Sequence, residues 1–155
     1  MAYEFHYRKM VEFHETDMAG IVHFSNYFRY MESAEHAFYR SLGLTVHCTR
    51  DGKIVSFPRG KVECRYSQVL RYEDLVDIHL LVREKRKKVI RYEFIFSRVL
   101  GEQLEEVARG AMTVICVTQV NPHGPFKSIP IPDFIDRWIE IAPEEAGAPA
   151  SIQKT

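Results

Sequence analysis

One helical stretch in a chain otherwise patterned for strands is the feature that most limits how this sequence can fold. From Asn26 onward, apolar residues recur at spacings of three and four, which places them on one face of a helix. These residues are Tyr27, Met31, Ala34, Phe38 and Leu42. Ser25 or Asn26 can cap the start, and Gly43 stands where a left-handed residue commonly ends a helix. The spacing predicts one long helix from Asn26 to Leu42.

The rest of the chain shows the alternation of apolar and polar residues expected of strands. The predicted strands cover residues 3–13, 53–57, 60–66, 75–83, 89–99 and 107–117. The charged residues 84–88 and the stretch 100–103 are typical of tight connections, so the strands they join must be antiparallel. A short amphipathic stretch, residues 134–141, is a second candidate helix. We therefore expect an α+β fold, in which a curled antiparallel sheet of five to six strands wraps round one central helix.

Length and composition place these elements in one domain. The chain has 155 residues, of which 46% are hydrophobic, so it can bury a core without disulfide bonds or a structural metal. We expect a single domain over residues 1–141 and a disordered tail, rich in Ala, Pro and Glu, over residues 142–155. The edge strands and uncovered apolar surface of such a sheet predict a partner subunit.

Charge and cysteine usage exclude several classes of protein. The 21 basic and 21 acidic residues give a formal net charge of zero, which argues against a general nucleic-acid-binding protein. Three separated cysteines without a CxxC pair favour a reducing cytoplasm over a disulfide framework. Neither a signal peptide nor an apolar segment long enough to cross a membrane is visible. The seven histidines show no metal-ligand spacing, so we predict no metal site.

The stretch from Glu12 to Tyr27 carries the strongest candidate chemistry. Asp17 precedes Gly20, and this glycine lies about six residues before the start of the predicted helix. Glycine lets the backbone turn sharply or approach a ligand closely. The first N–H groups of the helix lack internal partners and can stabilise an oxyanion, which acyl-transfer chemistry requires. From the residues alone, a second interpretation stays open: Asp17 can simply cap a turn.

The motif Asp17-x-x-Gly-Ile-Val-His-Phe-x-Asn-Tyr, continued by Phe-Arg-Tyr-Met-Glu, resembles the signature of the 4-hydroxybenzoyl-CoA thioesterase family of hotdog-fold enzymes. The similarity is most specific from Glu12 to Gly43 and extends more loosely over residues 3–134. The resemblance implies a hotdog fold. It also implies an acyl-CoA thioesterase, which hydrolyses an acyl- or aroyl-CoA thioester to the free acid and coenzyme A.

The resemblance further implies a role for each matching residue. Asp17 matches the catalytic aspartate, which acts as nucleophile or general base, and the backbone N–H of Phe24 matches the group that polarises the thioester carbonyl. His23 is a third catalytic candidate, although the hydroxybenzoyl enzyme has Trp there. The positions that match the substrate-binding site are Gly20, Asn26, Tyr27, Phe57 and Pro58. The last two match an acyl-pocket loop near the dimer interface, where Phe57 replaces a smaller polar residue of the hydroxybenzoyl enzyme.

A basic run supplies a candidate site for the nucleotide of coenzyme A. Residues 83–91 hold six basic residues and one acid, and such groups suit the phosphates of the nucleotide. By resemblance, the nucleotide contacts are Arg86, Lys87, Lys88 and Lys127. An ordinary solvated hairpin is the alternative. The resemblance implies no cofactor, because coenzyme A belongs to the substrate, and it implies at least a homodimer, with a homotetramer also compatible.

Other interpretations stay open at this point. Glu32 and His36 lie four residues apart on the predicted helix and can pair there. Glu32 is also a reserve catalytic candidate, because some hotdog thioesterases place their carboxylate on this helix. A non-catalytic hotdog protein that binds acyl-CoA or a protein partner is the main alternative function. A hotdog hydratase or dehydratase is less favoured, because its motifs at the helix entrance are missing from the sequence.

Overall fold

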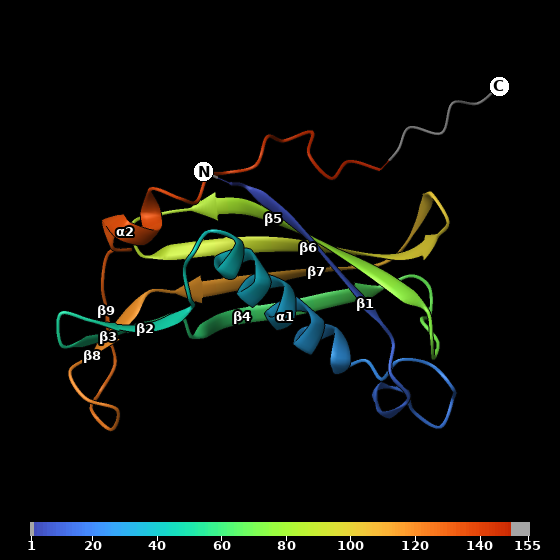
Figure 1. Ribbon diagram of the computed structural model, residues 1–155, viewed down its shortest axis with the longest axis horizontal. Helices are drawn as coiled ribbons and strands as arrows, with labels where there is room; N and C mark the ends of the chain where they lie inside the picture. The colour runs from blue at the N-terminus through green and yellow to red at the C-terminus, as the bar shows by residue number, and fades with distance from the viewer. Residues whose placement is uncertain (1, 150–155) are drawn as a thin grey trace.

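The computed structural model describes residues 2–149, which form a curled five-stranded antiparallel sheet with the long helix α1 (Asn26–Ser41) against its concave face (Figure 1). The strand order is β1-β5-β6-β7-β4. These strands span Glu4–Met10 (β1), Arg59–Tyr66 (β4), Leu75–Lys85 (β5), Val89–Leu100 (β6) and Gln103–Ile115 (β7). The predicted α+β architecture, with one helix on a curled antiparallel sheet, is confirmed.

Four short strands form a second sheet beyond the C-terminal end of α1 (Figure 1). They are β2 (His47–Arg50), β3 (Lys53–Ser56), β8 (Val117–Gln119) and β9 (Lys127–Ser128). The single strand predicted over residues 107–117 is therefore wrong in its bounds: the structure has β7 (Gln103–Ile115) followed by the separate strand β8. Cys116 separates β7 from β8: its N–H still bonds to the carbonyl of Lys88, next in register after the β6–β7 pairs, whereas residues from Val117 onward pair with β3.

The predicted apolar stripe of α1 packs on the sheet. Met31, Ala34 and Phe38 have no exposed surface, and Gly43 has the left-handed φ of +71° expected after the helix. On the sheet, Gly110 lies directly beneath Met31: a Cβ at this position would overlap the methyl group of Met31. The absence of a side chain at position 110 therefore lets the helix approach the sheet closely.

Three predicted elements at the chain ends differ from the structure. The N-terminal strand stops at Met10, and residues Phe13–Glu15 form a short 3-10 helix (η1). The predicted C-terminal helix is reduced to α2 (Asp133–Asp136). Residues 142–149, for which disorder was predicted, lie against the outer face of the sheet. Residues 150–155 of the predicted tail lie outside the described residues.

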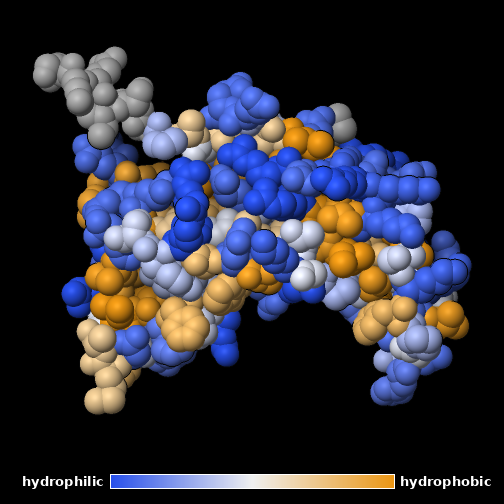
Figure 2. All heavy atoms as spheres, turned by 180° about the vertical axis from the view of Figure 1, so that it is seen from behind, coloured by the Kyte–Doolittle hydropathy of each residue, from blue (hydrophilic) through white to orange (hydrophobic). Residues whose placement is uncertain are grey.

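The outer face of the sheet, turned away from α1, is mostly hydrophilic (Figure 2). A small apolar cluster of Leu81, Ile95 and Ala142 anchors the C-terminal segment there. Arg83 and Arg109 donate hydrogen bonds to carbonyl oxygens of this segment, including those of residues 146 and 147. The predicted disorder of this segment is therefore not seen over residues 142–149, because these two guanidinium groups and the apolar cluster bind its backbone although the segment has few large apolar side chains of its own.

Candidate active site

A tight turn before α1 presents the carboxylate of Asp17. The N–H of Gly20 donates to the carbonyl of Asp17 at 2.9 Å, and Gly20 has a φ of +75°, which favours glycine. The N–H of Ala19 donates to Oδ1 of Asp17 at 2.8 Å, and the side chain is half-buried. Oδ2 has no hydrogen-bond partner among residues 2–149. The turn thus holds one oxygen, and the other is left without a partner in the described part of the chain.

The backbone at the helix entrance, seven residues after Asp17, carries a free donor. His23 N–H donates to the carbonyl of Glu15, and Ser25 N–H donates to Nδ1 of His23. Between them, the N–H of Phe24 has no acceptor in the described part of the chain, while its carbonyl accepts a bond from the Tyr66 hydroxyl at 3.0 Å. A free N–H at the positive end of a helix is suited to hold a thioester carbonyl oxygen.

The other residues predicted at this entrance have mainly positioning roles. Nδ1 of His23 lies 2.7 Å from the Ser25 hydroxyl, and its ring packs on Phe24 at 4.5 Å between centroids. The side-chain amide of Asn26 donates to the carbonyl of Glu15 at 2.8 Å. Neither Ser25 nor Asn26 therefore caps α1 with its side chain as predicted. Tyr27 is 2% exposed and points into the core, so in this chain it is a packing residue.

Glu15, which sequence reasoning missed, holds this loop together. Its carboxylate accepts bonds from the Lys9 ammonium and from the N–H of Glu12, both at 2.8 Å. Burial alone would raise the pKa of Glu15, but these two partners hold it below its ordinary value. The backbone carbonyl of Glu15 also accepts hydrogen bonds from the His23 N–H and from the side-chain amide of Asn26. Glu15 therefore connects the end of β1 to the helix entrance.

The predicted acyl-pocket loop lies near the other end of α1. Phe57 is buried and packs on Tyr39 with ring centroids 5.8 Å apart, whereas Pro58 is exposed. Both border a hollow of about 310 Å³. Its remaining lining residues are Glu32, Val46, His36, His47, Ser56, Arg59 and Phe126. Its lining thus combines apolar side chains with the charged groups of Glu32 and Arg59.

Glu35 and Arg59 form a buried ion pair under this hollow, and neither residue was singled out from the sequence. Glu35 has no exposed surface, and its carboxylate lies 2.9 Å from the Arg59 guanidinium. Burial raises the pKa of Glu35 to about 7, against the opposing effect of Arg59. The available signal was spacing: Glu35 lies four residues after Met31 and four before Tyr39 on a buried helix face.

The expected pairing of Glu32 with His36 is replaced by other contacts. Glu32 lies 3.3 Å from the Arg59 guanidinium, and the nearest carboxylate oxygen to His36 is that of Glu35 at 3.8 Å. Arg59 therefore bridges two carboxylates that lie one helical turn apart, and Glu32 takes part in an ion pair.

The basic residues predicted to bind the nucleotide do meet in space. The N–H of Ile131 donates to the carbonyl of Lys87, and Nζ of Lys88 lies 3.5 Å from the hydroxyl of Ser128, the neighbour of Lys127. The hairpin between β5 and β6 and the short strand β9 thus form one exposed basic surface. Arg86 is already paired with Glu84 at 3.1 Å.

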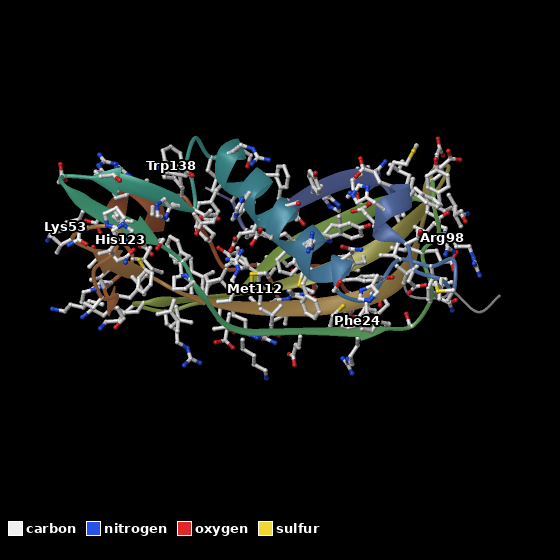
Figure 3. The ribbon with its side chains drawn as sticks, turned by 90° about the horizontal axis from the view of Figure 1, so that it is seen from below. Phe24, Lys53, Arg98, Met112, His123 and Trp138 are labelled. Atoms are coloured by element: carbon white, nitrogen blue, oxygen red, sulfur yellow. The ribbon has the colours of Figure 1, made fainter. Side chains whose placement is uncertain are left out.

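A single chain does not bring all the predicted site residues together. The turn of Asp17 and Phe24 lies at the start of α1, and Figure 3 shows Phe24 far from the end of the molecule that carries Lys53 and His123. The acyl-pocket loop and the basic surface belong to that other end. Glu32 and His36, which line the hollow beside the acyl-pocket loop, lie 6 and 10 residues after Asn26, so the hollow is displaced by about 9–15 Å along α1 from the helix start.

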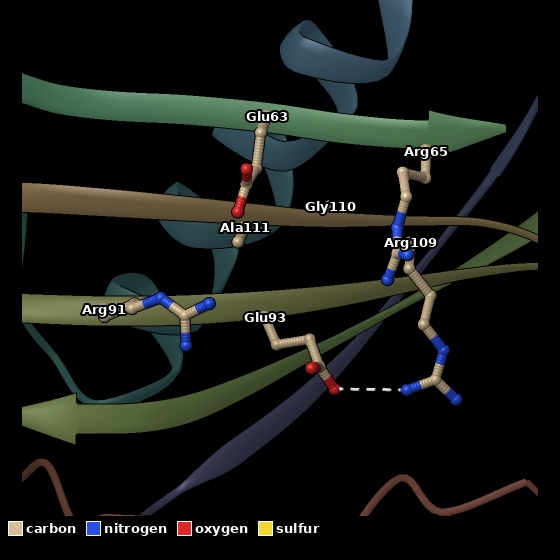
Figure 4. A pocket seen from close by; sticks show the side chains of 7 residues that line it. All are labelled: Glu63, Arg65, Arg91, Glu93, Arg109, Gly110 and Ala111. Carbon is tan, nitrogen blue, oxygen red and sulfur yellow. Dashed lines mark hydrogen bonds and ion pairs between the residues drawn. The ribbon is translucent and has the colours of Figure 1, made fainter.

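A charged hollow on the outer face is a separate feature. Figure 4 shows its lining residues, Glu63, Arg65, Arg91, Glu93, Arg109, Gly110 and Ala111, around a volume of about 330 Å³. Glu93 bonds to Arg83 and Arg109, so part of its charge is neutralised. This hollow lacks both a free backbone donor at a helix start and a carboxylate like Asp17, which makes it a poor candidate for acyl transfer.

Among the described helices, none is long and apolar enough to span a membrane.

A curled antiparallel sheet packed on one helix, with a turn that carries a carboxylate at the start of that helix, is the arrangement expected of hotdog-fold thioesterases. Comparison with known families agrees: the model of the Thioesterase-like superfamily matches residues 11–139, and the chain belongs to this superfamily. The predictions of a hotdog fold and of a thioester hydrolase are confirmed at this level.

Individual relatives are consistent with that assignment. A putative esterase of Aquifex aeolicus is 38% identical over 128 residues, which cover 81% of this chain and 91% of the relative. The 1,4-dihydroxy-2-naphthoyl-CoA hydrolase of Thermosynechococcus vestitus is 26% identical over 140 residues, 90% of this chain and 91% of that protein. A 4-hydroxybenzoyl-CoA thioesterase solved with 4-hydroxybenzoyl-CoA shares the fold, with a TM-score of 0.75, 21% identity, and coverage of 88% of this chain and 99% of that one.

Proposed function

We propose that the protein hydrolyses acyl- or aroyl-CoA thioesters to the free acid and coenzyme A. The observation that carries the proposal is that one turn before α1 holds both a carboxylate oxygen of Asp17 and the N–H of Phe24 without partners in the described part of the chain. Two relatives named above, a dihydroxynaphthoyl-CoA hydrolase and a hydroxybenzoyl-CoA thioesterase, support coenzyme A as the thiol.

The geometry supports a simple division of labour. The Phe24 N–H donates to the thioester carbonyl oxygen and stabilises the negative charge that develops there. Asp17 either attacks the carbonyl carbon and expels coenzyme A as its thiolate, forming a mixed anhydride that water then hydrolyses, or removes a proton from a water whose attack breaks the C–S bond and expels the thiolate. His23, held by Ser25 and packed on Phe24, positions the peptide that carries the donor. Water is the only co-reactant, so this reaction calls for no dissociable cofactor.

We further propose that the complete site forms between two copies of the chain. Within residues 2–149, β4 pairs with β7 alone, so its other edge is free. Its last residue, Tyr66, bonds to Phe24, and its first residue, Arg59, lies beside Pro58. Antiparallel pairing of β4 with a second copy of β4 would therefore place one chain's acyl-pocket loop beside the other chain's Asp17 turn. A homotetramer would contain two such homodimers.

Activity measurements on a series of acyl-CoA substrates test the proposed reaction. Short-chain, long-chain and aromatic acyl-CoAs are offered to the purified protein, and release of the free thiol is followed with a thiol reagent. We expect turnover of at least one substrate class. Binding of acyl-CoA without any thiol release would instead favour the non-catalytic alternative.

Mixed dimers test the shared site. Pro58→Arg fills the exposed hollow of one half-site, and Asp17→Asn disables the other half. If each site draws on both chains, a heterodimer of these two variants has one doubly defective site and one intact site. We expect purified heterodimers to recover roughly half of the wild-type activity, while each homodimer stays inactive. No recovery would mean that each site lies within one chain.

The basic surface should control binding of the nucleotide. We expect Lys87→Gln/Lys88→Gln/Lys127→Gln to raise KM by about tenfold and to leave kcat nearly unchanged, because these groups contact a part of the substrate remote from the thioester. The dependence of KM on salt should also weaken. Steady-state kinetics at two ionic strengths provide the measurement, with Arg40→Gln/Lys53→Gln as a control that removes two exposed positive charges outside the basic surface. An unchanged KM would assign the run to an ordinary solvated hairpin.

A further inference from the structure

Two histidines on neighbouring strands face each other on the outer surface of the sheet. His6 on β1 lies directly opposite His79 on β5, and their rings stack with centroids 4.0 Å apart and planes 12° apart. Glu4 lies two residues before His6 and therefore on the same face of β1. Its carboxylate lies 2.7 Å from Nε2 of His79. Strand pairing thus brings His79 to Glu4 and His6, which precede it in the chain by 75 and 73 positions, and so assembles three potential metal ligands.

The spacing of these groups suits a single ion. One ligand atom from each of Glu4, His6 and His79 can be chosen so that all three lie within 4.8 Å of one another. Their side chains are 42%, 48% and 15% exposed, respectively, so solvent can reach them. The cluster borders an outer-face hollow of about 400 Å³, on the opposite side of the sheet from α1. None of the three residues takes part in the proposed hydrolysis.

A buried carboxylate fixes the orientation of one histidine. Oδ2 of Asp77 lies 2.8 Å from Nδ1 of His6, and Oδ1 accepts a bond from Arg8 at 2.9 Å. Asp77 is 1% exposed. Because a carboxylate accepts, Nδ1 of His6 must donate, which leaves the lone pair of the neutral ring on Nε2. A histidine whose second nitrogen donates to a carboxylate is the usual arrangement of a metal ligand.

The second histidine would ligate through a ring nitrogen as neutral imidazole, the form that binds metals. Coordination at Nε2 would replace the present bond to Glu4 and move the ring proton to Nδ1.

We propose that Glu4, His6 and His79 bind a divalent transition-metal ion of the Zn²⁺ type on the outer face of the sheet. Two imidazoles and one carboxylate are ligands that Zn²⁺ prefers, and water would complete the coordination shell. The sequence predicted no metal site, because the ligands meet only through the pairing of β1 with β5. The site is independent of the proposed hydrolysis and lies on the far side of the sheet from Asp17.

The second cluster of this kind provides a matched control. Glu12, His14 and Glu15 also lie close together, but the Lys9 ammonium already occupies the Glu15 carboxylate. His14→Gln therefore removes an exposed histidine beside carboxylates without touching the proposed site.

Calorimetric titration with Zn²⁺ under reducing conditions tests the proposal. We expect the wild type to show one binding site that His6→Gln/His79→Gln weakens by about tenfold or more and that His14→Gln leaves unchanged. Zn²⁺ should also raise the melting temperature of the wild type and of His14→Gln, but not of the double variant. Because the free thiols can bind zinc as well, the decisive quantity is the difference between variants that share the same cysteines.

Two outcomes would overturn the proposal: equal Zn²⁺ binding by the double variant and the wild type, or no binding by either. The single variant His6→Gln keeps the test valid if the double variant does not fold, since it leaves the bond between His79 and Glu4 in place. We expect thioester hydrolysis to be unchanged by a chelator and by His6→Gln. The metal proposal can therefore fail while the proposed hydrolysis stands, and the reverse also holds.

Discussion

Asp17→Asn is expected to lower kcat by about 10²–10⁴-fold while leaving the fold intact. Asparagine keeps an oxygen that can accept the bond from the N–H of Ala19, so the turn ending at Gly20 should persist. What is lost is the negative charge, which both open routes require: an amide neither attacks the thioester as a nucleophile nor accepts a proton from water. Thiol release from the best acyl-CoA substrate measures the effect, and the melting temperature confirms folding.

Asp51→Asn is the matched control for this experiment. Asp51 is exposed, lies in a turn with a φ of +51°, and tolerates asparagine because both residues adopt this conformation readily. We expect its activity to equal that of the wild type. If Asp17→Asn hydrolyses substrate as fast as the wild type, Asp17 is only a turn residue, and Glu32 becomes the next candidate to examine.

Arg59→Met is expected to be the most destabilising of the changes considered, because it leaves Glu35 buried without its cation. Removing one partner of a buried ion pair costs about 3–5 kcal/mol when the remaining group stays charged. The pKa of Glu35 is raised to about 7 in the folded protein, against 4.5 ordinarily, so the folded state binds more protons between these values. Stability should therefore fall as pH rises through this window and level off above it.

This pH dependence distinguishes the buried pair from a simple packing defect. Without Arg59, the pKa of Glu35 rises further, so the fall in stability continues to higher pH. We expect the cost of Arg59→Met to be large at pH 8 and small at pH 5, where Glu35 is protonated in both proteins. Adding Glu35→Gln should remove most of the pH dependence. Urea unfolding at the two pH values provides the measurement.

Arg40→Met is the control for the loss of an arginine. Arg40 lies on the same helix, and its side chain is exposed. Its replacement should change stability by less than about 0.5 kcal/mol at either pH. An equal cost of Arg59→Met at pH 5 and pH 8 would contradict the assigned role of Glu35.

The geometry of the candidate catalytic turn could be predicted because its parts are neighbours in the sequence. Asp17, Gly20 and Phe24 lie within eight positions, and the turn and helix start that arrange them are local structures. The apolar stripe through Met31 and Phe38 likewise predicted α1 nearly to its ends. Local chemistry of this kind depends on hydrogen bonds and propensities that a single stretch of sequence contains.

Features that depend on distant pairing could not be predicted in this way. Strands β2 and β9 have four and two residues, and they exist because β3 and β8 present free edges to them. Glu35 forms an ion pair with Arg59, which lies 24 positions farther along the chain, and His6 lies opposite His79 in the pairing of β1 with β5. In each case the sequence contains the residues, but strand pairing and burial decide which of them meet.

The close contact between Gly110 and Met31 has a consequence for how this chain can vary. The two positions share one volume, since the methyl group of Met31 occupies the space that a Cβ at position 110 would need. In a relative with a larger residue at 110, the side chain at position 31 is expected to take another conformation or to be smaller, or the helix to lie farther from the sheet. Because Asp17 and Phe24 lie at the entrance of that same helix, a displaced helix would also displace this entrance. Aligned relatives should show these two positions changing together.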